Sequence, residues 1–297
     1  MTGLALSRGT ADRAGERRSD EAWLAATWAD AGTRILAVHE GETLTATDAP
    51  RLAWLTADRA PDGDRFFLGL DDGVAYFAVA GPLPETGARA AGLRELGASL
   101  DAREAGLLAH AVALERWHST HTHCPRCGAP TRVGAAGHVR VCTEDGSQHF
   151  PRVDPAVIML VHDDADRMLL ARNSAWPERR YSVLAGFVEP GESLEQAVAR
   201  EVGEEVGIAV TDPVYLGSQP WPFPSSLMLG FFARAVGDLT LRADDDEIAE
   251  ARWVARDSFP SLIRDGVMRF PPGISIARRL IERWYGGPIP DDSDWRR

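Results

Sequence analysis

The stretch from Gly186 to Ile208 constrains the fold of this 297-residue chain more than any other, because a glycine- and proline-broken loop there runs into a helical pattern. Ser193 and Gln196 have the spacing of a capping box, which predicts that the helix starts there. Gly207 suits the left-handed position that closes a helix. One face of this helix should be buried, since apolar residues recur at every fourth position: Leu194, Val198 and Val202.

The last turns of the same helix carry Glu201, Glu204 and Glu205. The helix dipole is negative at this end, and Glu201 and Glu205 repel each other, so each unfavourable contribution costs from a few tenths to about 1 kcal/mol. A solvated acidic face is the simple interpretation. A bound cation would reverse both penalties, and Mg²⁺ or Mn²⁺ prefers carboxylate ligands shared with substrate phosphates. The pattern therefore indicates a metal-dependent phosphate site.

The full spacing resembles the Nudix box, and it matches at every defined position: Gly186, Glu192, Arg200-Glu201, Glu204-Glu205 and Gly207-Ile208. The resemblance implies a mixed sheet between helices and hydrolysis of a nucleoside diphosphate derivative by water attack on phosphorus. It makes Glu201, Glu204, Glu205 and Arg200 the catalytic residues. The metal would be held by the backbone carbonyl of Ala185 and by the side-chain carboxylates of Glu201 and Glu205. Glu205 is the preferred general base, and the choice among the glutamates stays open.

A second motif, Ser218-Gln-Pro-Trp-Pro-Phe-Pro-Ser-Ser226, resembles the signature of the NADH pyrophosphatase family within the Nudix superfamily. Its prolines favour an extended backbone, and its two aromatic rings suit stacking on a base. The resemblance implies that Glu247, chosen over the neighbouring Glu250 by motif register alone, is another metal ligand. It also implies these substrate-binding residues: Phe150, Gln219, Pro220, Trp221, Pro222, Phe223, Pro224, Ser225, Ser226 and Ala277.

All three cysteines of the chain lie in one short segment, where Cys124 and Cys127 form half of a zinc site. The resemblance implies a four-cysteine zinc ribbon, but after Cys142 the fourth position is Asp145. The fourth ligand would be Asp145, or a nearby histidine: His149, His121 or His123. A metal-free remnant held by packing is the alternative. Phe150 replaces a tyrosine common in the family, so stacking is retained and a phenolic hydrogen bond is lost.

We expect an α+β protein with four parts: a flexible arm at 1–20, an N-terminal α/β domain at 21–120, a zinc-ribbon-like segment at 121–152 and a Nudix domain at 153–297. In the N-terminal domain, β-favouring runs predict strands at Ile35–Val38, Leu52–Leu55, Phe66–Leu70 and Val74–Val79. A helix should follow over Asp101–His118, with Asp101 and Glu104 at capping spacing. In the Nudix domain, strands are expected at Ala156–Val161, Met168–Ala171 and Tyr181–Leu184.

The formal net charge of −12 disfavours a protein that binds duplex nucleic acid by neutralising phosphates. An odd, clustered set of cysteines and a polar N-terminus favour the reducing cytoplasm and no membrane span. The family resemblance implies a homodimer acting on NADH and NAD⁺, and it extends to NAD-capped RNA. Two alternatives remain: a Nudix hydrolase of ADP-ribose or FAD, and a nucleotide-sensing protein in which the zinc ribbon binds nucleic acid.

Overall fold

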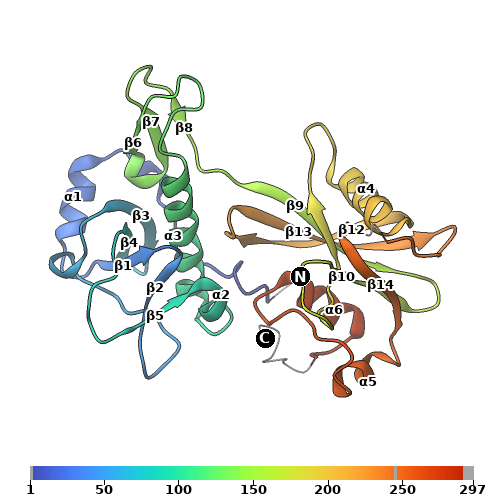
Figure 1. The fold of residues 1–297 in the computed structure, drawn as a ribbon. Helices are drawn as coiled ribbons and strands as arrows, with labels where there is room; N and C mark the ends of the chain where they lie inside the picture. The colour runs from blue at the N-terminus through green and yellow to red at the C-terminus, as the bar shows by residue number, and fades with distance from the viewer. Residues whose placement is uncertain (1–2, 244–245, 290–297) are drawn as a thin grey trace. The chain divides into compact units, whose positions relative to one another are not determined.

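The chain forms two compact units in the computed structural model, which describes residues 3–243 and 246–289 (Figure 1). The first unit comprises Met1–Ala5, Asp154–Gln219 and Ser226–Arg297. The second unit comprises Leu6–Val153 and Pro220–Ser225. Each unit is built on a mixed sheet with helices, so the expected α+β class is confirmed. Among the described residues, no helix combines the length and the apolar composition that crossing a bilayer requires.

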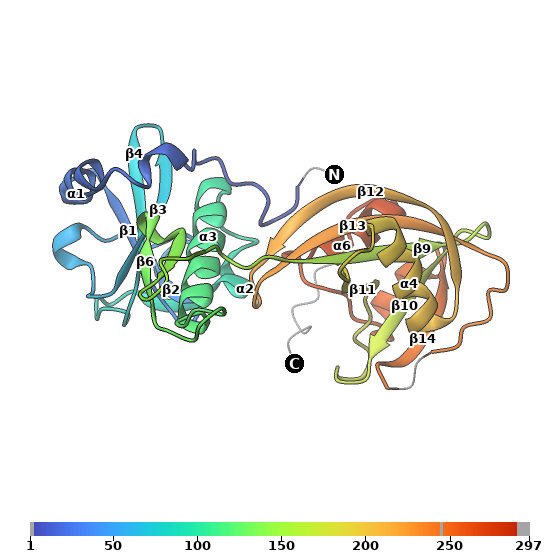
Figure 2. The same ribbon diagram turned by 90° about the horizontal axis from the view of Figure 1, so that it is seen from above.

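The second unit has a five-stranded sheet in the order β3-β4-β1-β2-β5. Its helices α1 and α3 lie on opposite faces of that sheet (Figure 2). Strand alternation explains the two layers, because Ile35 and Ala37 pack toward α1 and their neighbours in the strand point the other way. The elements are α1 (Glu21–Ala29), β1 (Arg34–His39), β2 (Glu42–Thr45), β3 (Asp64–Asp71), β4 (Val74–Ala80), β5 (Arg89–Gly92), α2 (Leu93–Leu96) and α3 (Ala102–Thr120).

Most expected elements of this unit are present. The side chain of Asp101 accepts a hydrogen bond from the backbone of Glu104 (2.8 Å), which caps α3 as the spacing predicted. The prediction of a strand at Leu52–Leu55 was wrong, because these two residues form only isolated bridges to neighbouring strands. Glu104 explains part of this, since it accepts a hydrogen bond from the Leu52 amide at 3.0 Å.

Several residues between Leu4 and Ala14 are packed, so the expectation of a flexible arm at 1–20 is corrected. Leu4 is buried in the core of the first unit, and Leu6 and Ala14 are buried as well. Asp12 exchanges backbone hydrogen bonds with Leu70 at 2.8 Å in both directions. A few apolar residues in a polar stretch are therefore enough to fix this segment.

The cysteine segment forms a small three-stranded antiparallel sheet. Its strands are β6 (Thr131–Gly134), β7 (Val139–Cys142) and β8 (Gln148–His149), and a short 3₁₀ turn at Ala135–Gly137 joins the first two. Cys124 and Cys127 lie in the turn before β6, whereas Cys142 ends β7 and Asp145 lies in the turn after it, an arrangement that brings two pairs of ligands together.

The first unit has a six-stranded mixed sheet between helices, with β13 parallel to β9, and with β10 and β11 antiparallel to β9 and β14 antiparallel to β10. Helix α4 packs on one face, and α6 packs on the other (Figure 1). The elements are β9 (Asp154–His162), β10 (Arg167–Asn173), β11 (Leu184–Phe187), α4 (Leu194–Val206), β12 (Ala209–Trp221), β13 (Ser226–Val236), β14 (Ile248–Ala255), α5 (Phe259–Arg264) and α6 (Ile276–Tyr285).

Helix α4 begins and ends where its local sequence predicted. Ser193 and Gln196 form both hydrogen bonds of the capping box, and Gly207 closes the helix in the left-handed conformation with φ 72°. The expected strand at Tyr181–Leu184 is displaced, because β11 only begins at Leu184. This displacement matters for the site, since β11 then carries Ala185 and Gly186 beside the glutamates of α4.

Candidate active site and metal centre

Glu201 of α4 lies against the backbone of β11. A methyl group added at Gly186 would sit 1.9 Å from the carboxylate carbon of Glu201, so only glycine leaves room for that side chain. Ala185 precedes Gly186 in the same strand. A glycine is therefore needed at position 186 for steric reasons, because it lets the Glu201 carboxylate approach the backbone next to the carbonyl oxygen of Ala185.

Arg200 ties the loop to the helix. Its guanidinium donates hydrogen bonds to Glu192 (2.6 Å) and to the carbonyl of Phe187 (2.9 Å). It also donates to Glu201 and Glu204, each at 2.9 Å. These bonds, the one with Glu192 above all, raise the pKa of Arg200 and keep it charged. The arginine thus fixes the carboxylates in place, as a rigid fork with several donors can.

Glu205 is the buried acid of the site. Its side chain is only 5% exposed, and its Oε2 atom is buried without a hydrogen-bond partner among the described residues. Burial, and then the charges of Glu247 and Glu201, raise the pKa of Glu205 to about 8. Burial also raises the pKa of Glu201, and Glu247 adds to that rise. An unpaired buried carboxylate is costly, so this site stores electrostatic strain.

The structure separates the two candidate carboxylates of the last strand. Glu247 precedes β14 at the edge where its charge acts on Glu201 and Glu205. Glu250 instead accepts hydrogen bonds from Tyr181 and Arg252. Because Tyr181 packs in the core on the α6 side of the sheet, Glu250 faces away from α4. The geometry therefore favours Glu247 as the partner of the α4 glutamates.

This donor set fits a divalent cation. An orphaned oxygen on Glu205 is faced by the charges of Glu201 and Glu247, and oxygen donors of this kind are those that Mg²⁺ and Mn²⁺ accept. Glu204 lies at the outer rim, since its side chain is 61% exposed and bonded to Arg200. A cation would remove the repulsion that the buried carboxylates otherwise suffer.

The residues expected to bind substrate fall into different surroundings. Gln219 is fully buried, and its amide donates to the carbonyl of Ile274 at 2.9 Å. Ala277 is packed into the core of the first unit, so its methyl group does not reach solvent. Phe150 is 66% exposed, as a ring available for stacking must be. Phe150 and the segment Pro220–Ser225 belong to the second unit, whereas Gln219, Ser226 and Ala277 belong to the first.

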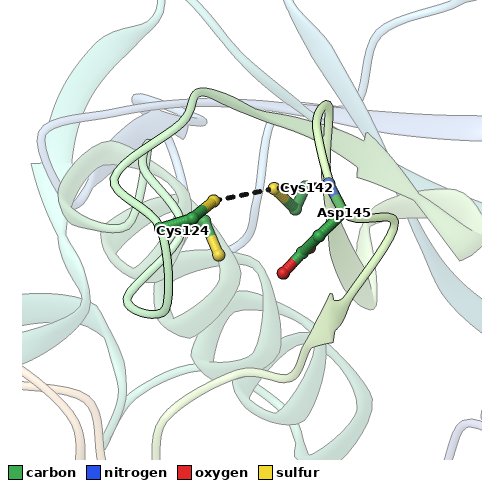
Figure 3. Close-up of side chains that lie close together, drawn as sticks. Cys124, Cys142 and Asp145 are labelled. Atoms are coloured by element: carbon green, nitrogen blue, oxygen red, sulfur yellow. Dashed lines mark hydrogen bonds between the residues drawn. The ribbon is translucent and has the colours of Figure 1, made fainter.

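A second candidate metal centre lies in the small sheet, at Cys124, Cys127, Cys142 and Asp145. One ligand atom from each of these four residues lies within 4.8 Å of all the others. Figure 3 shows the side chains of Cys124, Cys142 and Asp145 pointing toward one another. Hydrogen bonds from Ser147 lower the pKa of Asp145 to about 2, so this carboxylate is charged at neutral pH. Three sulfur atoms and a carboxylate are a donor set that zinc accepts.

The three histidines considered as alternative ligands bond elsewhere. His149 shares a hydrogen bond with Ser147 at 3.1 Å. His121 contacts the carbonyl of Trp117 at 3.1 Å, and His123 contacts Thr122 at 2.9 Å. The geometry therefore favours Asp145 as the fourth ligand.

Comparison with known proteins identifies the family of each part of the chain. Three family models match consecutive parts of the chain: the NADH pyrophosphatase-like rudimentary NUDIX domain at 32–117, the NADH pyrophosphatase zinc ribbon domain at 119–150 and the NUDIX domain at 152–270. The NAD-capped RNA hydrolase NudC of Mycobacterium bovis (strain BCG / Pasteur 1173P2) is 43% identical over 295 residues, which cover 94% of each chain. The chain belongs to the NADH pyrophosphatase family of Nudix hydrolases.

Other relatives in the NADH pyrophosphatase family match shorter spans. NAD-capped RNA hydrolase NudC of Stutzerimonas stutzeri (strain A1501) is 41% identical over 230 residues, covering 76% of this chain and 83% of its own. NAD-capped RNA hydrolase NUDT12 of Macaca fascicularis is 41% identical over 197 residues, covering 62% of this chain and 42% of its own.

Sequence reasoning missed some residues of this NADH pyrophosphatase-family site. Glu192 was counted only as a motif position, yet it binds Arg200 with two oxygens. Its place in the motif was the available signal. Arg94, which lies over the rings of Phe223 and Trp221, and Arg116, which lies near the ring of Phe223, carried no signal in the sequence.

Proposed function

We propose that the protein hydrolyses the pyrophosphate of NADH and NAD⁺, releasing nicotinamide mononucleotide (reduced, for NADH) and AMP, and that it removes NAD caps from RNA 5′ ends. The observation that carries the proposal is the buried, unpartnered Glu205 oxygen beside Glu201 and Glu247. This acid cluster stands in a chain that is 43% identical, over 94% of its length, to an NAD-capped RNA hydrolase. The net charge of −12 disfavours extended contacts with RNA phosphates.

Mg²⁺ or Mn²⁺ would be held by Glu201, Glu205 and Glu247, with the backbone carbonyl of Ala185. When bound, such an ion neutralises charge on the pyrophosphate and makes a bound water more acidic. The protein's own residues supply the rest of the chemistry. Arg200 holds Glu201 and Glu204 in position through the hydrogen bonds described above. Glu205 accepts the proton of the attacking water, because its free oxygen has no other partner among the described residues.

The small sheet has a structural role in this proposal. Cys124, Cys127, Cys142 and Asp145 would hold one zinc ion, which fixes the turns around β6 and β7. A reducing compartment keeps clustered cysteines as thiols that can bind zinc, so we propose that the enzyme acts in the cytoplasm. We also propose a homodimer. Val214 and Tyr215 support it, because they are more than half exposed on the edge strand β12.

The test is a chromatographic assay of purified protein with NADH, with and without Mn²⁺, that measures AMP and reduced nicotinamide mononucleotide. We expect both products in equal amounts, only with the metal. Glu205→Gln should lower the turnover rate at least about 100-fold, because it removes the proton acceptor. Glu195→Gln is the matched control, since Glu195 is exposed in the first turn of α4 and should be dispensable.

The alternatives make different predictions in the same assay. If ADP-ribose or FAD is turned over faster than NADH, that compound becomes the proposed substrate, and pyrophosphate hydrolysis remains the proposed reaction. Binding of nucleotide without any product, in folded protein with metal present, would favour the sensor. Unchanged turnover in Glu205→Gln would refute the proposed proton transfer.

A further inference from the structure

The proline-aromatic segment belongs to the unit that carries no catalytic carboxylate. Pro220–Ser225 groups with Leu6–Val153, whereas its flanking residues Gln219 and Ser226 group with the Nudix unit. Within the segment, Trp221 and Phe223 form an edge-to-face pair with centroids 5.0 Å apart and planes at 75°. The rings therefore support each other, and the arginines nearest to them also lie in the second unit.

Two arginines of that unit lie over the rings. The guanidinium carbon of Arg94, in α2, is 4.0 Å from the ring centre of Phe223 and 5.2 Å from that of Trp221. The guanidinium carbon of Arg116, in α3, is 5.8 Å from the ring centre of Phe223. All three distances are within the range of cation–π attraction, and 4.0 Å is a contact.

The position of Arg116 is itself prepared by the fold. Gly41 forms the turn between β1 and β2 with φ 78°, and a methyl group there would lie 2.7 Å from a guanidinium nitrogen of Arg116. Only glycine accepts that backbone angle at no cost and leaves the space. The hairpin of the second unit thus makes room for the arginine that approaches Phe223.

Phe223 lies outside the sheet, so the orientation of its ring depends on side-chain contacts. Strand β12 ends at Trp221 and β13 begins at Ser226, so the four residues between them lie outside the sheet. The Phe223 amide donates to the carbonyl of Trp221 at 2.7 Å, which tightens the turn. The sheet fixes the backbone of Trp221, and the two arginines restrict the ring of Phe223 beyond the end of β12.

We infer that Arg94 and Arg116 are positioning residues for substrate binding, which hold Trp221 and Phe223 ready to stack on a base of the dinucleotide. This inference rests on the proposed function, because it needs the two rings to contact substrate. The rudimentary domain then contributes to affinity without contributing a catalytic group. Rings that are fixed before substrate arrives lose less conformational freedom on binding. Freeing the rings by removing an arginine should therefore weaken the affinity for substrate.

The experiment compares Arg94→Gln, Arg94→Lys and Arg116→Gln with the wild-type enzyme. We expect the KM for NADH to rise about tenfold in Arg94→Gln while kcat changes less than about twofold. Arg94→Lys should fall between, since an ammonium keeps the charge and loses the flat stacking surface. Arg116→Gln should have a smaller effect than Arg94→Gln, because its distance to the ring is greater.

Arg65→Gln is the matched control. Arg65 lies 4.0 Å over the ring of Trp28 in the same unit, so this variant loses an equivalent contact away from the segment. It should lower the melting temperature as much as Arg94→Gln does and leave KM unchanged. Equal rises in KM for both variants would show a general loss of stability and would overturn the inference.

A double-mutant cycle with Phe223→Leu tests whether Arg94 acts through the ring. If it does, adding Arg94→Gln to Phe223→Leu raises KM by no more than about twofold further. Independent, multiplying effects would refute the positioning role. The dissociation constant of NADH, measured by calorimetry with Ca²⁺, is determined in parallel for each variant. No hydrolysis by the wild type overturns the proposed function, whereas equal dissociation constants in wild type and Arg94→Gln overturn the inference.

Discussion

Replacing Glu205 with glutamine should stabilise the metal-free enzyme, although it should lower the turnover rate of the metal-loaded enzyme at least about 100-fold. In the fold, burial and the neighbouring carboxylates raise the pKa of Glu205 to about 8, whereas in the unfolded chain it titrates near 4.5. The folded state therefore holds an extra proton between these two values. Since the unfolded state releases its proton first as pH rises, stability falls across this window.

The size of the effect follows from the two pKa values. At pH 7 the folded enzyme has lost about 3 kcal/mol relative to a neutral side chain, and at pH 5 only about 1 kcal/mol. Glutamine is neutral and nearly isosteric, so it avoids this cost. We expect Glu205→Gln to raise the free energy of unfolding of the Nudix unit by up to about 3 kcal/mol at pH 7, which corresponds to about 6–12 °C in Tm.

The assay is scanning calorimetry of wild type, Glu205→Gln and Glu195→Gln without added divalent cations, at pH 5 and pH 7. The gain should grow with pH in Glu205→Gln and be absent in the exposed control. Added Mn²⁺ should stabilise the wild type more than Glu205→Gln, because metal binding replaces the proton. A gain that is the same at both pH values, or no gain at pH 7, would refute the electrostatic account of this site.

Gly186→Ala should lower kcat about 100-fold by displacing the carboxylate of Glu201, whereas Gly203→Ala should remain active, because an added methyl there meets nothing within 4 Å. Steady-state kinetics measures both variants, and full activity of Gly186→Ala would contradict the steric reasoning. Mass spectrometry of metals should find an equivalent of zinc per chain, and Asp145→Ala should reduce it; unchanged zinc would exclude Asp145 as a ligand. Burial lowers the pKa of His138 to about 4, so the fold keeps its full stability above pH 6.5 and loses about 3 kcal/mol of unfolding free energy as pH falls to 4. Urea unfolding of the wild type and of His138→Gln across this pH range checks the loss, and parallel pH profiles of stability for the two proteins would contradict it.

Local signals in the sequence predicted the parts of the site that depend on neighbouring residues. The ends of α4 are set by a capping box and a left-handed glycine, and both act within a few residues. The three cysteines were likewise found because a tight turn keeps Cys124 and Cys127 close together. Motif register alone selected Glu247, and strand geometry now gives a reason, since Glu250 points to the opposite face.

Contacts between distant parts of the chain were not predictable in the same way. Nothing near Arg94 in the sequence indicates that a ring more than a hundred residues later will lie beneath it. The run Leu52–Leu55 has the composition of a strand, but its bridging partners decide how far pairing extends. The polar N-terminus concealed Leu4, because average composition hides a single apolar anchor.

Leu4 also sets an order of events when the chain is made. It leaves the ribosome before every other core residue of the Nudix unit, yet the residues it packs with begin at Ile158. The chain between Leu4 and Ile158 belongs largely to the other unit, and it is synthesised before the partners of Leu4. Leu4 is thus made well before the residues it packs against, and it reaches its final environment only after the intervening unit has been synthesised.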